Sequence, residues 1–325
     1  MNPRENAVRI VRFDQPERIV GALPGLTLAY CGCNHDGFAG GGHDSPVGSR
    51  WTDIWGTGWH KEHDGWMGYP EVWPLAQLPA ALKTYRWPDP DDERICSTIH
   101  RQAMDADRAK GFLIGSHRDT LWEKAYMLLG MKNALCFFLS EPRAMREVLR
   151  RIMDFQLAIA RHYLDAGVEA VSLSDDLGCQ DRLLFSRQII EEFLIPEYRR
   201  LFDLYRSRGV LIQFHSCGHI EPVLDIFMDL GVDVLNPVQA TANNLDRVRA
   251  VTQGRMALQG GVRSGIVMNG PIEAIRDEVR RRLWQLGREG GYFCCADQAL
   301  PYPAEHLEAM RAAVREFGAY PLEQG

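Results

Sequence analysis

Short apolar runs alternate with long helical patterns through the last two thirds of the chain, and this alternation constrains the fold most. The runs are rich in apolar and β-branched residues, as buried strands are, and cover 111–116, 170–173, 210–214, 232–235, 256–259 and 292–295. Between them, apolar residues recur every three or four positions, which predicts helices over 142–165, 186–207, 220–230, 272–286 and 303–317. Glycines just beyond several predicted helices fit helix-stop positions: Gly167, Gly209, Gly231 and Gly287.

Repeated strand and helix units predict a parallel sheet, either as an eight-fold barrel or as a doubly wound sheet. Polar or reactive residues recur where the predicted strands end: Asp175, Asp176, His215, Cys217, Asn236, Gly260-Gly261, Cys294 and Cys295. A barrel gathers all strand ends around one mouth, whereas an open sheet would separate some of them. We therefore predict a (β/α)8 TIM barrel with an N-terminal extension and loop-rich insertions. It forms one domain over 1–325, with a loop-rich part (1–95) and the main barrel repeats (96–325).

The composition of the chain limits the kinds of partner that it is expected to bind. The chain has 325 residues, 46% of them hydrophobic, a net charge of -6 and a pI near 5.9, which gives no general attraction to nucleic acid or to an anionic membrane. No run is long enough to span a membrane, and residues 1–17 lack the apolar centre of a secretory signal, so we expect a cytoplasmic protein. Its eight dispersed cysteines are then free thiols or metal ligands.

A histidine and a cysteine stand two positions apart at the end of one predicted strand. Side chains at i and i+2 of a strand point to the same face, so His215 and Cys217 are candidate zinc ligands, although a buried structural pair has the same pattern. A zinc site needs a third protein ligand, and Cys294 or Cys295 is the candidate. Adjacent cysteines point in opposite directions, so at most one of them faces the metal.

Zinc at this place would have a chemical purpose, because a zinc-bound thiol loses its proton near neutral pH and becomes a nucleophile. Methyl transfer to sulfur uses that chemistry. Alternatively, the metal polarises a methyl ether or amine so that the methyl departs. Asp175 and Asp176 are candidate catalytic carboxylates beside His215, and their alternative role is that of a helix cap or loop acid. Both cannot face inward.

The N-terminal part holds two further clusters. One combines cysteine and histidine in spacings that match no zinc finger, so loop residues are favoured over a second metal site: Cys31, Cys33, His35, His43, His60 and His63. The other consists of tryptophans, which form either a small core or an aromatic wall over the mouth: Trp51, Trp55, Trp59, Trp66 and Trp73. In a wall, Asp53 and Trp55 are candidate substrate contacts.

Several short motifs together resemble the uroporphyrinogen decarboxylase superfamily, specifically its zinc-dependent, corrinoid-linked methyltransferases. They are Asp175-Asp176-Leu177-Gly178-x-Gln180, Phe214-His215-Ser216-Cys217-Gly218-His219, Gly231 through Gln239, Gln259-Gly260-Gly261 and Gly290-Gly291-Tyr292-Phe293, with Asp53-Ile54-Trp55-Gly56 and Trp87-Pro88-Asp89-Pro90 upstream. The resemblance implies a barrel in which His215, Cys217 and a later cysteine hold zinc. It also implies a small methylated substrate (a methoxyaromatic, methylamine or thiol) and a corrinoid carried by a partner protein.

Two departures accompany the resemblance. The arginine-rich motif with which uroporphyrinogen decarboxylases cradle propionates has no counterpart before Cys31, which disfavours decarboxylation of that tetrapyrrole. Gln298 stands where the family's late zinc ligand is expected, and glutamine is a poor zinc ligand. With Asn236 and Gln259, it is instead a candidate substrate contact. A metal-free decarboxylase and a non-catalytic binding barrel remain the alternative functions, and a homodimer is the candidate assembly.

Overall fold

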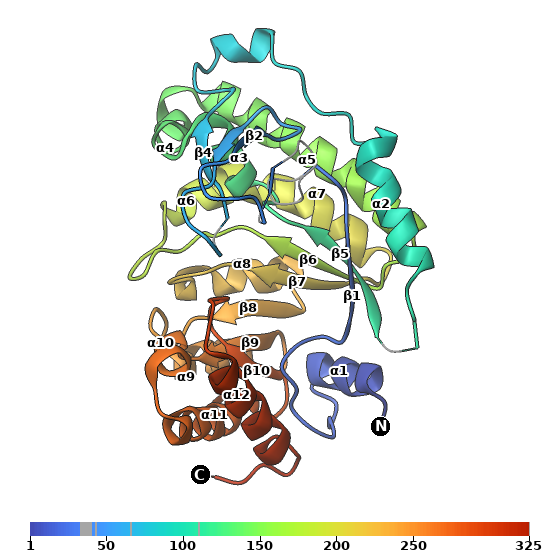
Figure 1. The fold of residues 1–325 in the computed structure, drawn as a ribbon, viewed down its shortest axis with the longest axis vertical. Helices are drawn as coiled ribbons and strands as arrows, with labels where there is room; N and C mark the ends of the chain where they lie inside the picture. Colours follow the sequence, from blue (N-terminus) through green and yellow to red (C-terminus); the bar gives the residue numbers. More distant parts are fainter. Residues whose placement is uncertain (33–40, 43, 66, 110, 325) are drawn as a thin grey trace.

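A curled sheet of seven parallel strands forms the centre of the computed structural model, which describes residues 1–32, 41–42, 44–65, 67–109 and 111–324 (Figure 1). In spatial order the strands are β1 (Gly25–Ala29), β5 (Phe112–His117), β6 (Ala170–Ser174), β7 (Leu211–His215), β8 (Val234–Val238), β9 (Ala257–Val262) and β10 (Tyr292–Ala296). Every neighbouring pair is parallel. The carboxyl ends of the strands therefore lie at one edge of the sheet, as the prediction of a shared mouth requires.

The predicted α/β class and parallel sheet are confirmed, and six strands lie where the apolar runs predicted them. β1 was not predicted. The described residues form seven strands in this sheet, one fewer than an eight-stranded barrel has, so the closed barrel stays a prediction.

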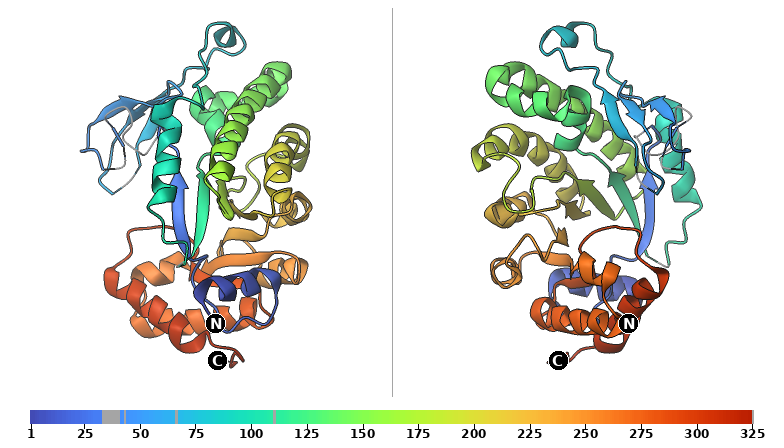
Figure 2. Two further views of the ribbon diagram at one scale, coloured as in Figure 1. Left: turned by 90° about the vertical axis from the view of Figure 1, so that its right-hand side faces the viewer. Right: turned by 60° about the vertical axis from the view of Figure 1, so that its left-hand side comes forward.

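Helices cover the outside of the curled sheet (Figures 1 and 2). They are α1 (Pro3–Arg12), α2 (Glu93–Met104), α3 (Trp122–Leu129), α4 (Met131–Ser140), α5 (Pro142–Asp165), α6 (Arg187–Ile189), α7 (Ile195–Arg206), α8 (Leu224–Leu230), α9 (Leu245–Thr252), α10 (Ser264–Asn269), α11 (Ile272–Gly287) and α12 (Ala304–Phe317). Short turns are η1 (Ala80–Lys83), the π-helical η2 (Ile190–Leu194) and η3 (Glu221–Val223). Within the described ranges, no helix combines the length and apolar character of a membrane span.

α5 has the bounds that its periodicity predicted. Its apolar stripe, which includes Val148, Leu149 and Ile152, is fully buried against the sheet and neighbouring helices. Each such side chain contributes about 1.5–3 kcal/mol when it leaves water. The predicted helix over 186–207 is instead a succession of α6, η2 and α7.

On β7, buried apolar residues that pack against helices alternate with partly buried polar residues. Ile212 and Phe214 are fully buried, and the Phe214 ring packs against Tyr198, Phe202 and Phe227 of the helices outside the sheet. Gln213 and His215 alternate with them and are only partly buried. Because successive strand residues point to opposite faces, these two polar side chains point to the interior of the curl.

A buried histidine ties β5 to two helices. The His117 Nδ1 atom donates to Gln156 Oε1 of α5 at 2.7 Å, and Nε2 accepts a proton from the Tyr205 hydroxyl of α7 at 2.5 Å. Burial lowers the pKa of His117 to about 4. Its ring is therefore neutral at physiological pH and serves the packing of the fold.

The two edge strands of the curl, β1 and β10, do not pair with each other. The chain segment before β1 lies beside β10 instead, where the Cys294 amide donates to the Val20 carbonyl at 2.9 Å. The first three residues of β1, Gly25 to Thr27, are exposed, as the edge of an open sheet is. The curl is thus closed by the hydrogen bond between Cys294 and Val20, and it is open where β1 and β10 do not pair.

A small antiparallel sheet of β2 (Arg50–Thr52), β3 (Gly58–His60) and β4 (Tyr69–Val72) lies beside the main sheet (Figure 2). The Trp51 and Trp59 rings stack 6.5 Å apart and pack with Met127 of α3 in a small core, as one of the two alternatives predicted, whereas Trp55 lies in the main core and Trp73 is exposed. Four residues of the predicted N-terminal clusters lie outside the described residues: Cys33, His35, His43 and Trp66.

Candidate metal and active site

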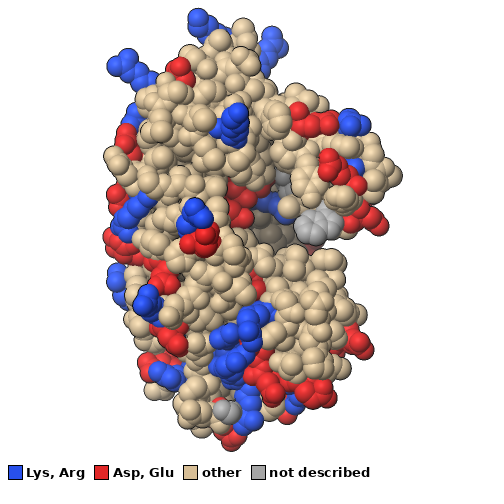
Figure 3. Space-filling view, turned by 90° about the vertical axis from the view of Figure 1, so that its left-hand side faces the viewer, with Lys and Arg blue, Asp and Glu red and all other residues tan. Residues whose placement is uncertain are grey.

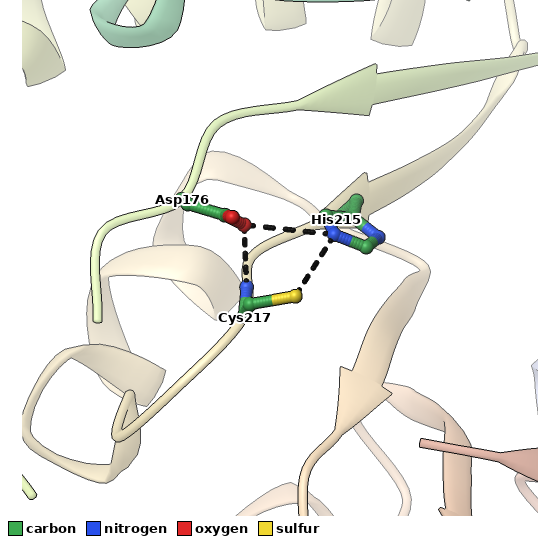
Figure 4. Close-up of side chains that lie close together, drawn as sticks. All are labelled: Asp176, His215 and Cys217. Carbon is green, nitrogen blue, oxygen red and sulfur yellow. Dashed lines mark hydrogen bonds and ion pairs between the residues drawn. The ribbon is translucent and has the colours of Figure 1, made fainter. Parts of the chain in front are cut away.

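Three side chains meet at the carboxyl ends of β6 and β7 (Figure 4). Asp176 follows β6, His215 is the last residue of β7, and Cys217 lies in the loop after it. Their ligand atoms all lie within 4.8 Å of one another. The His215 Nε2 atom is 3.2 Å from the Cys217 Sγ atom and 3.5 Å from Asp176 Oδ1. A nitrogen, a sulfur and an oxygen donor thus surround one point, a set that zinc accepts.

The orientation of the His215 ring is set by Asn236 of β8. The His215 Nδ1 atom lies 2.8 Å from Asn236 Oδ1, and since an amide oxygen only accepts, Nδ1 carries the proton. The lone pair of Nε2 therefore points to Cys217 and Asp176. A second residue that fixes the tautomer in this way is a regular feature of metal-binding histidines.

Backbone contacts hold Cys217 in place, although β7 ends before it. Its amide donates to Asp176 Oδ1 at 2.8 Å, and the His219 amide donates to the Cys179 carbonyl at 2.7 Å. Gly218 has a φ of +83°, and a Cβ there would lie 2.5 Å from the Cys179 carbonyl oxygen. Glycine is required because the loops after β6 and β7 approach so closely.

Burial, followed by the charge of Asp176, raises the pKa of the Cys217 thiol to about 12. The thiol alone therefore keeps its proton at neutral pH. A bound cation would reverse this balance, because it stabilises the thiolate directly.

The two adjacent aspartates have separate positions, as their alternation predicted. Asp175 is fully buried and accepts the amides of Leu121 at 2.8 Å and Glu123 at 2.7 Å, at the start of α3, together with the Tyr198 hydroxyl at 2.6 Å. It is the cap of α3, and burial raises its pKa to about 7. Asp176 alone points to His215 and Cys217.

Further ionisable groups, which the sequence reasoning missed, lie beside Asp176. Burial and then the charges of Asp119, Asp175 and Asp176 raise the pKa of Glu123 well above its usual value. The pKa of Tyr126 is raised by burial and the same acids. Asp119 and Glu123 follow β5 in the chain. The rule that polar residues cluster at strand ends could therefore have identified them from the sequence.

Gln298 lies at the same site, in the loop after β10. Its Nε2 atom is 3.4 Å from the Cys217 Sγ atom and 3.3 Å from Gln239 Oε1. Gln239 Oε1 also accepts the Gly218 amide at 3.0 Å. The residue that replaces the expected late ligand thus contacts the sulfur, and Gln239 was not predicted.

The late cysteines are not part of the group of three ligands. Cys294 is 1% exposed and packs in the main apolar core, where burial raises its pKa to about 12. Cys295 points the other way, as predicted for adjacent residues, and its Sγ atom lies 3.7 Å from Gln259 Nε2. Gln259 Oε1 accepts from Gln213 at 2.6 Å. Among the described residues, Asp176 is the third side chain beside His215 and Cys217, and metal binding by Cys294 or Cys295 stays a prediction.

Asp53 and Trp55 are buried, and neither belongs to the group of Asp176, His215 and Cys217. The Asp53 carboxylate accepts the amides of Trp55 at 2.9 Å and Thr57 at 3.0 Å and the indole N–H of Trp59 at 3.0 Å. Trp55 is 1% exposed and packs on Phe155, with ring centres 4.6 Å apart. Both residues organise the turn between β2 and β3, so their contact with a substrate stays a prediction.

A cavity of about 690 Å³ adjoins the site. Its lining includes the polar residues His215, Asn236, Gln259, Cys295 and Gln298. The face of the molecule that carries the strand ends is itself hollowed, and acidic and basic side chains lie within the hollow (Figure 3). The His215 and Asp176 side chains are 34% and 44% exposed, so the site is reachable by a ligand.

Fold and site together define a barrel-like α/β protein with a candidate metal site at the carboxyl ends of its parallel strands. The sequence profile described as Uroporphyrinogen decarboxylase (URO-D) matches residues 113–317. The chain belongs to this family.

Curated relatives carry the same description. The chain is 30% identical over 222 residues to the Uroporphyrinogen decarboxylase of Methylococcus capsulatus, a match over 65% of this chain and 60% of that protein. With the Uroporphyrinogen decarboxylase of Saccharopolyspora erythraea it shares 28% over 161 residues, or 47% of this chain and 43% of that protein. Each match spans less than two thirds of the relative's length.

A solved structure shares the fold over its whole length. The structure described as "methyltransferase from Methanosarcina mazei" superimposes with a TM-score of 0.72, covering 98% of this chain and 99% of that one. At 15% sequence identity, this likeness shows the fold and not the activity.

Proposed function

We propose that this protein is a zinc-assisted methyltransferase that moves a methyl group between a small methylated substrate and a corrinoid protein. The observation that carries the proposal is the convergence of His215 Nε2, Cys217 Sγ and an Asp176 carboxylate oxygen within 4.8 Å. The description of the Methanosarcina mazei structure as a methyltransferase adds support. The closed eight-stranded barrel belongs to the same proposal.

The chain's residues fit zinc. Their donors are the nitrogen, sulfur and oxygen that zinc prefers, and three protein ligands leave a fourth position for a substrate atom. Bound there, zinc would act as a Lewis acid on a substrate heteroatom or lower the pKa of a substrate thiol.

Several residues would prepare this chemistry. Asn236 keeps the proton on His215 Nδ1, so that Nε2 stays available as a donor. Asp176 holds the Cys217 amide and thereby positions the thiol. Glu123, whose pKa burial raises well above its usual value, would hold a proton more readily than an exposed carboxyl group and is the candidate donor to a leaving oxygen or nitrogen.

The transfer itself would leave the methyl carbon's oxidation state unchanged. The methyl moves without its bonding electrons, which stay with the atom it leaves, while the acceptor supplies the pair for the new bond. Gln259 and Gln298 would contact the rest of the substrate, since both line the adjoining cavity.

Metal content and methyl transfer test this proposal. We expect close to one equivalent of zinc in protein purified without chelators, and loss of most of it in Cys217→Ser. Incubation of the zinc-loaded protein with cob(I)alamin and thioethers, methylamines or methoxyarenes should give the spectrum of methylcobalamin. Less than about a tenth of an equivalent of zinc, unchanged in Cys217→Ser, would refute the proposal.

Decarboxylation is the second candidate, favoured by the description of both curated relatives. Glu123 and Asp176 would then donate and accept the protons of the reaction without a metal ion. Release of CO₂ from uroporphyrinogen by metal-free protein would establish this function in place of methyl transfer.

A further inference from the structure

The cavity beside the site lies where the curl of the sheet is open. Val20 and Ala22, from the segment before β1, line it together with Cys294 and Cys295 of β10. The Cys294 amide bond to Val20 bridges the two edges, and no described residue of β1 pairs with β10 beyond it. The cavity therefore opens through the side of the curl, between two strand edges that a complete barrel would join.

α12 forms the outer wall of this side opening. Leu307, Met310, Arg311 and Val314 line the cavity and follow one another at three- and four-residue spacing, which places them on one face of the helix. The wall is mainly apolar. Ile19 and Leu300 extend the same apolar surface from the opposite sides.

The rim of the opening is basic. Arg18, Arg311 and Arg315 line the cavity. Arg18 donates to the Arg315 backbone carbonyl, and Arg315 pairs with Glu308. Arg311 is exposed and forms no ion pair with any residue that the structure describes, so its guanidinium is available to an anion.

The cavity lining thus combines amides and His215 at the strand ends, an apolar face of α12, and the exposed arginines Arg311 and Arg315. Its volume of about 690 Å³ lies within the range of sites for small organic ligands, about 300–1,000 Å³. A guanidinium binds a carboxylate through two parallel hydrogen bonds, which no neutral group matches.

We propose that this side opening binds a small amphipathic carboxylate, with its carboxylate at Arg311, its apolar body along α12 and its far end at His215. The placement of a methyl-bearing group at that far end rests on the proposed function, whereas the binding of the carboxylate does not. The small ligand would then occupy the side of the curl and leave the hollowed face at the strand ends to a larger partner.

Calorimetric titration of the zinc-free Cys217→Ser protein with 1-naphthoate and its neutral isostere 1-naphthamide tests the proposal without any methyl transfer. We expect naphthoate to bind at least about tenfold more tightly than naphthamide, and Arg311→Ala to remove that preference while naphthamide binding is unchanged. Arg255→Ala is the matched control, since Arg255 is an exposed arginine outside the cavity lining. It should bind both probes like the parent.

A second variant locates the binding. Ala22 is exposed and lines the opening, so Ala22→Trp fills it with little effect on the core and should weaken both probes at least about tenfold. Ala299→Trp narrows the opening from the loop after β10 and should act in the same direction. Equal binding of the two probes, absence of binding, or full binding by both tryptophan variants would overturn the inference. If the parent protein neither holds zinc nor transfers methyl groups, the proposed function fails, and binding of the probes as expected would still uphold this inference.

Discussion

Replacing Asn236 with alanine should weaken zinc binding without removing a ligand. The Asn236 Oδ1 atom accepts the Nδ1 proton of His215 at 2.8 Å, and this bond both selects the tautomer and fixes the ring. Loss of a partner of this kind costs metal affinity about 10- to 100-fold, or about 1.4–2.8 kcal/mol. We expect Asn236→Ala to fall in that range, and Asn236→Asp, which keeps an acceptor oxygen, to bind zinc at least as tightly as the parent.

Competition with a chromogenic zinc chelator at pH 7.5 measures the affinity of each variant. Gln259→Ala is the matched control, because Gln259 is a polar neighbour on β9 that contacts Gln213 and Cys295 rather than His215. It should keep the parent's affinity within about twofold. Our reasoning fails if Asn236→Ala binds zinc as tightly as the parent, or if Gln259→Ala loses as much as Asn236→Ala.

Three other predictions follow from the structure. Gln298→Cys places a thiol beside Cys217 and should raise zinc affinity about tenfold or more, whereas Gln298→Ala should change it little, as measured by the same competition. Gly218→Ala should destabilise the fold by more than Gly209→Ala in urea unfolding, because both have positive φ but only Gly218 has backbone within 3 Å of the new Cβ. Burial holds the pKa of His117 at about 4 against 6.5 for the unfolded chain, so only the unfolded chain takes up this proton between those values, and the unfolding free energy falls by about 3 kcal/mol as the pH drops from 6.5 to 4. His117→Gln should flatten the dependence of unfolding free energy on pH in that interval, and equal slopes would contradict the assignment.

The central strands could be predicted from the sequence because most of their residues are apolar and buried. β1 escaped prediction for the opposite reason: its residues Gly25 to Thr27 are exposed at the open edge, and its short sequence carries little apolar signal. α3 and α4 were missed because they join almost directly at Gly130, within one stretch without clear punctuation.

Within the site, the sequence indicated His215 and Cys217 because a strand end positions both. Which of Asp175 and Asp176 faces His215 depends on where α3 begins. The backbone amides at the start of that helix donate to Asp175, so its carboxylate does not face His215. Whether Cys294 or Cys295 lies near His215 and Cys217 depends on how the edge strands β1 and β10 are arranged. Pairings between distant segments of this kind leave no local pattern in a sequence.

The contacts between the loops after β6 and β7 also bear on the order of events during assembly. The bonds from Cys217 to Asp176 and from His219 to Cys179 join the ligand-bearing loops before any ion arrives. Metal capture would then require little loss of chain entropy, because the two loops are already joined. The amides of Cys217 and His219 should consequently exchange their hydrogens slowly in metal-free protein, at rates close to those of the zinc-loaded form.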